Sequence, residues 1–221
     1  MIEVSQVRKK YGKKLVLEDI SFTVQSGECV AIIGKNGCGK STLLKVLAGV
    51  LKAESGEISY YGESRLRKRS KMCGYVPQEN PLLEQLSVKD NLYLWGGKNA
   101  LLQQEILEEF QLQELLHEPA EKLSGGMKRR LSVACALLHE PSILLLDEPT
   151  AALDFFYKEQ MLNWVKSYQK KNGIVIIVTH EEQEILSADR CFLMESGRIR
   201  ELKKEEVTLE NIREIIFEKY S

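Results

Sequence analysis

The sequence predicts an α/β fold with a mixed, largely parallel sheet, an N-terminal antiparallel β region and an inserted α-helical subdomain. Unbroken apolar runs rich in β-branched residues indicate strands buried on both faces of a parallel sheet, and they cover residues 29–33, 143–146 and 174–178. Alternating polar and apolar residues from 2 to 61 indicate the antiparallel region, and apolar residues at helical spacing from about 79 to 138 indicate the subdomain.

No internal repeat or low-complexity linker divides the chain, so we expect a single domain over residues 1–221, with residues 1–78 and 139–221 forming the core around the subdomain. Two apolar stripes of the subdomain are expected to pack in its own core, and their members are Val88, Leu92, Trp95, Leu102, Ile106 and Phe110. Residues 154–171 predict a further helix. Alternating charges predict an amphipathic C-terminal helix around Leu209, Ile212, Ile216 and Tyr220.

A glycine-rich segment with the pattern G-x-x-x-x-G-K-S follows the first apolar run. Between a strand and a helix, this pattern predicts the phosphate-binding loop of a P-loop NTPase core, because glycines let backbone amides converge on phosphate oxygens at the positive end of the helix. The loop lysine is placed to reach the β and γ phosphates of ATP, and the serine hydroxyl to bind Mg²⁺. The residues predicted to bind nucleotide here are Gly34, Lys35, Asn36, Gly37, Cys38, Gly39, Lys40, Ser41 and Thr42.

The other two apolar runs also end in polar residues, Asp147 and Glu148 after one and His180 after the other. Since the carboxyl ends of parallel strands share one edge of a sheet, we expect these side chains beside the phosphate loop. Asp147 is predicted to hold magnesium, through water, and Glu148 to orient or deprotonate an attacking water. His180 is predicted to hydrogen-bond the γ phosphate. Carboxylates that cap a turn and a surface histidine are the alternatives.

A second anion-binding helix start is predicted at Ser124-Gly125-Gly126, which precedes apolar residues at helical spacing over residues 127–138. Ser124 is expected to cap this helix and to leave the glycine amides bare. One triphosphate rarely needs two such helix starts, so a nucleotide held by a second copy of the chain is the expected ligand. An ordinary capped helix is the alternative.

In this order the motifs resemble the nucleotide-binding subunits of ATP-binding-cassette (ABC) transporters, over nearly the whole chain. The resemblance is carried by Tyr11-Gly12-Lys13, residues 34–42, Val76-Pro77-Gln78, Leu123-Ser124-Gly125-Gly126, residues 144–148, Ala152-Leu153-Asp154 and His180. It implies an ATPase that closes as a head-to-tail pair around two Mg-ATP and powers transport by a separate transmembrane permease subunit. Whether the pair is a homodimer or a heterodimer is left open.

The resemblance also implies roles for individual residues. Tyr11 would stack on adenine, because every base offers a π face, although a core tyrosine is the alternative. Gln78 would serve catalysis and the magnesium site and couple them to the helical subdomain. The Ser124-Gly125-Gly126 motif would bind the γ phosphate held by the opposing subunit, and Asp154 would communicate across the dimer.

Met127 departs from the family, in which glutamine is most frequent at this position, and a thioether cannot replace the hydrogen bonds of an amide. The run Met127-Lys128-Arg129-Arg130-Leu131 resembles the exporter branch, whose membrane partners are separate subunits. The transporter reading therefore favours export. An ABC ATPase with another task, such as iron–sulfur cluster assembly, is the alternative, and a catalytically silent nucleotide-binding subunit is the third possibility.

Composition limits the other partners. The chain is 43% hydrophobic and carries a formal charge of −1, so it has no signature of a nucleic-acid-binding protein. No apolar stretch reaches the roughly 18 residues that a membrane helix needs, and the first residues lack a secretory pattern. We therefore expect a cytoplasmic protein that lies peripherally on the inner face of the cell membrane through its partner.

The five cysteines are dispersed and predict reduced thiols rather than disulfides. Cys38 differs from the rest because it lies inside the phosphate loop near Lys40, where surrounding amides and the ammonium group favour a lowered thiol pKa. An inert thiol that fills the loop is the alternative.

Two segments are candidates for contact with the membrane or the permease. The basic run of residues 65–71 is expected to be a solvated loop, with contact to lipid headgroups or the partner as the alternative. An apolar stretch follows Gln78, and its members are Pro81, Leu82, Leu83 and Leu86. It offers a groove for a short partner helix, although for some of its leucines burial in the core of the subdomain is the expected outcome.

Overall fold

Buried apolar runs build the larger of two sheets in this computed structural model, which describes residues 1–151 and 153–217, without the side chains of Lys98, Asn99 and Leu102. The six strands of this sheet lie in the order β5-β6-β7-β3-β8-β9. Their bounds are β3 (Cys29–Ile33), β5 (Cys73–Val76), β6 (Ile143–Asp147), β7 (Ile174–Val178), β8 (Arg190–Glu195) and β9 (Arg198–Glu201). All neighbouring pairs are parallel except β8 with β9. The predicted mixed, largely parallel sheet is confirmed.

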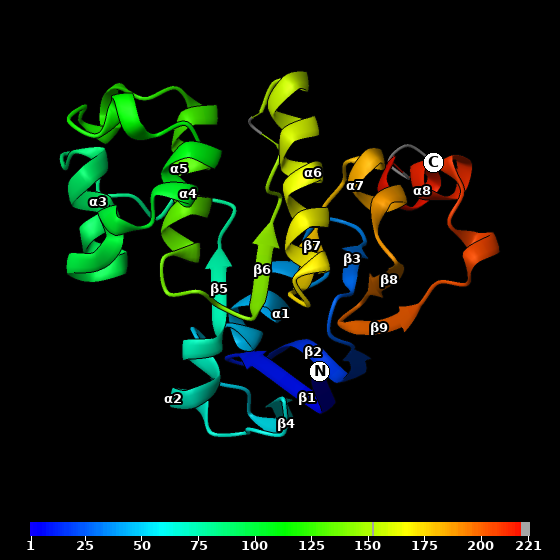
Figure 1. The fold of residues 1–221 in the computed structure, drawn as a ribbon. Helices are drawn as coiled ribbons and strands as arrows, with labels where there is room; N and C mark the ends of the chain where they lie inside the picture. Colours follow the sequence, from blue (N-terminus) through cyan, green and yellow to red (C-terminus); the bar gives the residue numbers. More distant parts are fainter. Residues whose placement is uncertain (152, 218–221) are drawn as a thin grey trace.

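The N-terminal region forms the smaller, antiparallel sheet, as predicted, with the order β2-β1-β4 (Figure 1, lower part). Its strands are β1 (Ile2–Tyr11), β2 (Lys14–Val24) and β4 (Ser55–Tyr60). Apolar residues of this sheet share one buried cluster with helix α1 (Lys40–Leu47) and with β3, β6 and β7. The antiparallel sheet therefore packs on the face of the large sheet that α1 covers.

Alternate residues of β6 reach opposite faces of the sheet, which explains why its sequence shows no polar interruption. Ile143 and Leu145 join the α1 cluster, whereas Leu144 and Leu146 join a second cluster with α6 (Phe155–Lys170). The helix predicted over residues 154–171 is confirmed by α6. On the β3–β8 part of the sheet, α7 (Glu182–Ser187) and α8 (Leu209–Phe217) cover Ala31 and Ile33 of β3 through Ile185 and Ile212. The amphipathic C-terminal helix is confirmed, and Tyr220 lies outside the described residues.

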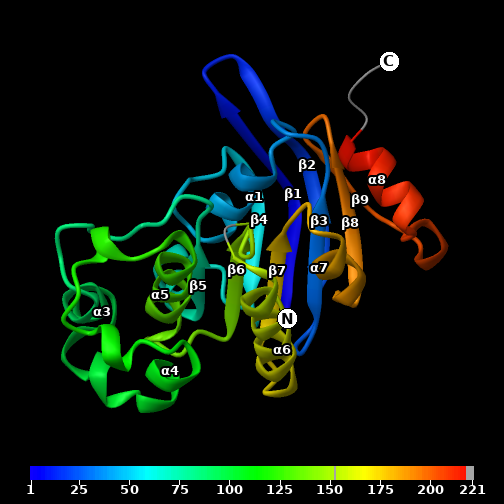
Figure 2. The same cartoon turned by 90° about the horizontal axis from the view of Figure 1, so that it is seen from above.

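Between β5 and β6 the described residues form helices and loops but no strand, which confirms the predicted helical subdomain. This subdomain lies to one side of the sheet (green in Figures 1 and 2). Its α-helices are α3 (Val88–Gly96), α4 (Gln104–Glu109) and α5 (Gly125–Leu137). Short 3-10 helices lie at Gly97–Leu102, Gln113–Leu115 and Ala120–Lys122. One buried cluster joins α3, α5, β6 and α6. The subdomain therefore shares its core with the sheet.

Two expectations were wrong, one about the burial of a side chain and one about the backbone of the basic run. Trp95 was expected in the core but is 49% exposed, because the last turn of α3 carries it to the surface while Val88 and Leu92 are buried. The basic run forms α2 (Leu66–Arg69) and a 3-10 helix (Ser70–Met72) rather than a loop. Within it Arg69 is only 6% exposed, since its guanidinium lies over the ring of Tyr60 at 5.0 Å.

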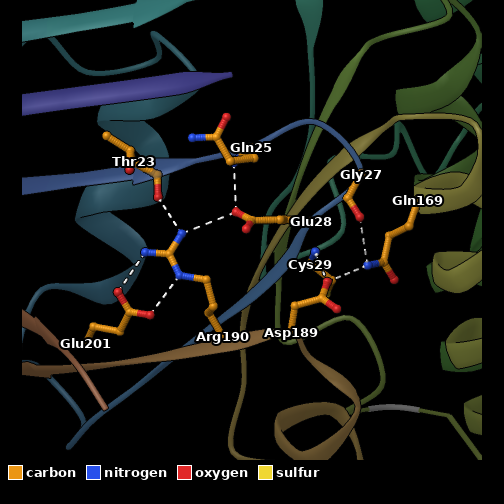
Figure 3. Close-up of polar contacts among 9 residues, drawn as sticks. All are labelled: Thr23, Gln25, Gly27, Glu28, Cys29, Gln169, Asp189, Arg190 and Glu201. Atoms are coloured by element: carbon orange, nitrogen blue, oxygen red, sulfur yellow. Dashed lines mark hydrogen bonds and ion pairs between the residues drawn. The ribbon is translucent and has the colours of Figure 1, made fainter. Parts of the chain in front are cut away.

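A polar network holds the amino ends of β3 and β8 (Figure 3). Arg190 donates to both carboxylate oxygens of Glu201 at 2.7 Å, to Glu28 at 3.2 Å and to the carbonyl oxygen of Thr23 at 2.9 Å. Asp189 accepts from the backbone amide of Cys29 at 2.8 Å and from Gln169 at 2.7 Å. These bonds tie β2, β3, β8, β9 and α6 together, and so fix the strands whose opposite ends carry the candidate site.

Candidate functional site

Three neighbouring strands bring the predicted polar residues to one edge of the sheet. β6, β7 and β3 are adjacent, and all three are parallel. Lys40 begins the helix after β3, Asp147 ends β6, and His180 follows β7. The structure therefore brings these residues together at the carboxyl ends of the strands, as expected.

Glycines of the phosphate loop are required by neighbouring backbone. Gly34 has φ 147°, and a Cβ there would lie 2.1 Å from the carbonyl oxygen of Met194. Gly39 has φ 115°, and a Cβ there would lie 2.9 Å from the carbonyl oxygen of Val16. Gly39 also caps α1 without a side chain that would occupy the first amides of the helix. The loop therefore offers unobstructed amides at the positive end of α1.

Lys40 lies across its own loop. Its ammonium group donates to the carbonyl oxygens of Gly34 at 2.5 Å and Lys35 at 3.1 Å, and burial lowers its pKa. A phosphate oxygen is a stronger acceptor for an ammonium than a carbonyl is, because the bond is then assisted by charge on both sides. Of the remaining loop residues, Asn36 and Gly37 are exposed, whereas Ser41 and Thr42 are half-buried.

Ser41, Gln78 and Asp147 line one cavity of about 370 Å³ at the start of α1. Burial raises the pKa of Asp147, while the Ser41 hydroxyl acts in the opposite direction. Among the described residues, the buried Oδ1 of Asp147 has no hydrogen-bond partner. Hydroxyl, amide and carboxylate oxygens are hard donors, and Mg²⁺ is commonly held by one carboxylate together with substrate phosphates. The three predicted ligands therefore fit a magnesium ion.

Glu148 contacts the other two predicted catalytic residues. Gln78 donates from Nε2 to Oε2 of Glu148 at 3.0 Å, and Nε2 of His180 lies 3.7 Å from Oε1. The backbone of Glu148 is in the left-handed region, with φ 49°, although it is not a glycine. Such strain gathers at functional sites, where the surrounding structure holds it. Here the amide of Glu148 donates to the carbonyl oxygen of Val178 at 2.8 Å.

Burial and the nearby Lys40 ammonium lower the pKa of His180, in that order, so its ring is neutral at pH 7. Among the described residues, neither ring nitrogen has a hydrogen-bond partner. A neutral imidazole keeps one N–H donor and one acceptor. The ring can therefore donate to an anion that enters beside Glu148.

Ser124 caps α5, as predicted, and its hydroxyl accepts from the amide of Met127 at 3.2 Å. Ser124 and Gly125 are exposed, and no acidic residue occupies the first turn. Among the described residues, the hydrogen bonds of Ser124 join it to Met127 and Lys128 of its own helix, and none joins it to the phosphate loop of the same chain. The side chain of Met127 packs on the apolar cluster of the subdomain, where a thioether fits better than an amide.

Two residues that the resemblance singled out lie at the surface. Tyr11 ends β1 and is 49% exposed, so the alternative of a core tyrosine was wrong. Asp154 caps α6 by accepting from the amide of Tyr157 at 3.1 Å. Ala152, in the same motif, lies outside the described residues.

Cys38 does not have the lowered pKa that its surroundings led us to expect. Burial raises the pKa of its thiol, and Lys40 opposes this only in part. The alternative of an inert thiol is therefore the better interpretation. All five cysteines are free, as predicted.

A buried acid near Thr179 and Thr150 was not predicted from the sequence. Glu184 of α7 is buried, and burial raises its pKa to about 7, although the hydroxyls of Thr179 and Thr150 act in the opposite direction. Its signal was weak, since Glu181 and Glu182 precede it and acidic runs are commonly solvated.

We expect Glu184→Gln to raise the melting temperature more at pH 8 than at pH 5. In the unfolded chain the carboxyl has its ordinary pKa of 4.5, so between 4.5 and about 7 the folded chain retains a proton that the unfolded chain has lost. Stability then falls as pH rises through this window, and the amide removes that loss. Thermal unfolding at both pH values measures the difference. Glu182→Gln, at the surface beside Arg213, is the control and should give no such gain; parallel melting curves for wild type and Glu184→Gln would contradict the assignment.

No helix among the described residues is both long and apolar enough to span a membrane.

Similarities to known proteins extend over most of the chain. The profile of the ABC transporter family matches residues 17–151. The chain is 40% identical over 209 residues to the Nod factor export ATP-binding protein I of Burkholderia lata, covering 89% of this chain and 68% of that protein. It is 36% identical over 217 residues to the sulfate/thiosulfate import ATP-binding protein CysA of Escherichia coli, covering 90% of this chain and 59% of that protein.

A solved structure is also similar. It is the dimeric post-hydrolysis state of the ATP-binding cassette MJ0796 bound to ADP and Pi, with a TM-score of 0.83 and 27% identity. The match covers 92% of this chain and 98% of that one.

Proposed function

We propose that this chain, which belongs to the ABC transporter family, is an ATPase that closes as a pair around two Mg-ATP and powers transport by a separate membrane subunit. One observation carries the proposal. The Lys40 loop, Glu148 and His180 share one edge of the sheet, whereas the bare helix start at Ser124 faces solvent in another part of the chain. A single chain thus holds two halves of a phosphate site that do not meet, and a second copy supplies the missing half of each.

In the proposed site, Lys40 and the amides at the start of α1 bind the β and γ phosphates, and Tyr11 stacks on adenine. Ser41, Gln78 and Asp147, the last through water, would hold Mg²⁺, which would neutralise phosphate charge when bound. Glu148 accepts a proton from the attacking water at the oxygen that Gln78 leaves free. Neutral His180 donates to a γ-phosphate oxygen. Asp154, the cap of α6, communicates across the pair.

Dimerisation driven by ATP tests the shared site. Glu148→Gln with Mg-ATP should elute as a dimer in size-exclusion chromatography, because bound γ phosphate is not consumed, and adding Ser124→Arg should return it to a monomer. The matched control is Ser87→Arg, which removes the serine cap of α3 in the same subdomain and should leave the dimer intact. A dimer that forms without ATP and survives Ser124→Arg would sink the shared-site proposal.

The helical subdomain is the proposed contact with the membrane subunit, which would hold the chain at the inner face of the cell membrane. Among the described side chains of the subdomain, Leu83, Leu94 and Trp95 are large, apolar and exposed, whereas Leu82 of the predicted groove is buried. We propose export, since Met127 and the basic residues after it resemble the exporter branch and the identity to the Nod factor export protein is 40%. Co-purification of charge-substituted subdomain variants with the membrane subunit tests the contact.

A further inference from the structure

A buried arginine in α5 contacts the backbone on both sides of the catalytic residues. Arg129 is 3% exposed. Its Nε donates to the carbonyl oxygen of Pro149 at 3.1 Å, and its two terminal nitrogens donate to the carbonyl oxygens of Pro77 and Asp147. Pro77 directly precedes Gln78 in the sequence. One guanidinium therefore holds three separate points of backbone around the site.

Two of these carbonyl groups flank Glu148, the residue in the left-handed conformation. The third precedes Gln78, whose side chain donates to the Glu148 carboxylate. Arg129 therefore fixes both partners of the Gln78–Glu148 hydrogen bond through their backbone. A rigid five-donor fork can hold several carbonyls at fixed angles, which a lysine cannot do.

Packing alone does not explain an arginine at this position. Burial lowers its pKa to about 10, so it is still a cation at neutral pH, and the charges of Asp147, Glu184 and Glu148 act in the opposite direction. Its hydrogen bonds all go to neutral carbonyls. A buried cation without a directly bonded carboxylate costs several kcal/mol, whereas an apolar side chain of similar volume would not carry that cost. What the arginine adds is the position of the three carbonyls.

The same helix begins at the exposed Ser124 cap. Arg129 lies little more than one turn after this cap in the uninterrupted helix α5, and the amide of Lys128 donates to the carbonyl oxygen of Ser124 at 2.9 Å. A displacement of the capped end is therefore transmitted to the guanidinium without an intervening loop.

We propose that Arg129 is a positioning residue that keeps Gln78 and Glu148 aligned and ties this alignment to the Ser124 end of α5. The inference rests on the proposed function, in which Ser124 binds the γ phosphate held by the partner copy. Engagement of that phosphate by one chain then sets the geometry of the same chain's own Glu148. Hydrolysis at the two sites is linked inside each subunit as well as across the interface.

Arg130 provides a matched control on the same helix. It is 7% exposed, and it donates to the carbonyl oxygen of Phe110 at 3.2 Å and to Gln111 at 3.0 Å. Its guanidinium also lies 4.3 Å from the ring centroid of Tyr157. These partners belong to the subdomain and α6 rather than to the loops of the site. Loss of Arg130 therefore reports the effect of removing a buried arginine from α5 without touching Gln78 or Glu148.

Four variants of the purified chain test the proposal: Arg129→Met, Arg129→Lys, Arg130→Met and Arg130→Lys. Arg129→Met should lower kcat for ATP at least ~10-fold while the Kd for ATP changes less than about twofold, because the phosphate loop is intact. Arg129→Lys should restore part of the rate, since it keeps the charge but not the fork. The Arg130 variants should shift the melting temperature and leave kcat within about twofold. Equal loss of kcat in the two arginine series would overturn the proposal.

A double-mutant cycle with Glu148→Gln, measured in single turnover, separates positioning from general damage. If Arg129 acts through Glu148, Arg129→Met should cause little further loss once Glu148 is already glutamine. If the rate loss of the double variant equals the product of the two single losses, the inference is overturned. Should Arg129→Met not fold, the Arg129→Lys cycle decides in the same way. If the wild-type chain has no ATPase activity, the result counts against the proposed function. If the wild type is active and Arg129→Lys and Arg129→Met keep its kcat, the result counts against this inference alone.

Discussion

Glu148→Gln is expected to lower ATP turnover by roughly 10²-fold or more, because a positioned general base contributes at least that factor. The amide has the same size as the carboxylate but accepts no proton from water. Gln78 donates to one carboxylate oxygen at 3.0 Å, and the amide of the variant can still present an oxygen to that donor. The binding of ATP should therefore be retained while hydrolysis is lost.

Steady-state phosphate release and equilibrium binding of ATP measure the two effects separately. Glu140→Gln is a close control, because Glu140 is also a glutamate in the left-handed conformation, with φ 51°, and it is exposed in the loop after α5. That variant should keep the wild-type rate. Normal turnover by Glu148→Gln would remove Glu148 from the role of base, and a parallel loss in Glu140→Gln would show that backbone strain, not the carboxylate, is being measured.

The buried strands were the most predictable part of the fold. The runs at β3, β6 and β7 are apolar up to the Asp147 that ends β6, because both faces of these strands are covered, and their short length favours strands over buried helices. Their order was not predictable in the same way. That β3 lies between β7 and β8 depends on long-range pairing that no local pattern encodes.

Motif residues of the site could be named from the sequence because each motif is local. The glycines of the loop and the polar residues after each strand are fixed by position along the chain. Arg129 could not be recognised, since Lys128, Arg129 and Arg130 in succession read as a solvated basic run. In the structure both arginines of this run are buried, and which carbonyls they meet depends on how α5 packs against two loops that are distant in sequence.

The errors have the same origin. Arg69 belongs to a basic run that composition assigns to solvent, yet Tyr60 provides an aromatic face on which its guanidinium stacks. Cys38 lies among amides and near Lys40, which favours a thiolate, but burial dominates and raises its pKa. In both cases the local sequence identifies the neighbouring groups, while the sign of the effect depends on how much solvent the fold removes.

Lys40→Ala should differ from Glu148→Gln by weakening ATP binding itself, by about 10- to 100-fold. Charge-assisted hydrogen bonds are worth about 1.5–3 kcal/mol each, and the lysine is the side-chain cation of the phosphate loop in the proposed site. Lys52→Ala removes the same charge from an exposed position shortly after α1 and should bind ATP normally. Equilibrium titration with ATP in the presence of Mg²⁺ compares the two variants.

The same substitution has a consequence that needs no nucleotide. Burial and, after it, the Lys40 ammonium lower the pKa of His180, so Lys40→Ala should raise that pKa part of the way toward its ordinary value of 6.5, whereas Lys52→Ala should not. NMR titration of the His180 ring measures it. If ATP binding falls while the His180 titration stays unchanged, Lys40 does not face the edge where His180 lies. If the titration moves while ATP affinity stays normal, the lysine lies in the site but does not hold the phosphates. Both changes together place one ammonium group between the phosphate loop and the end of β7, which is the arrangement that the catalytic assignment requires.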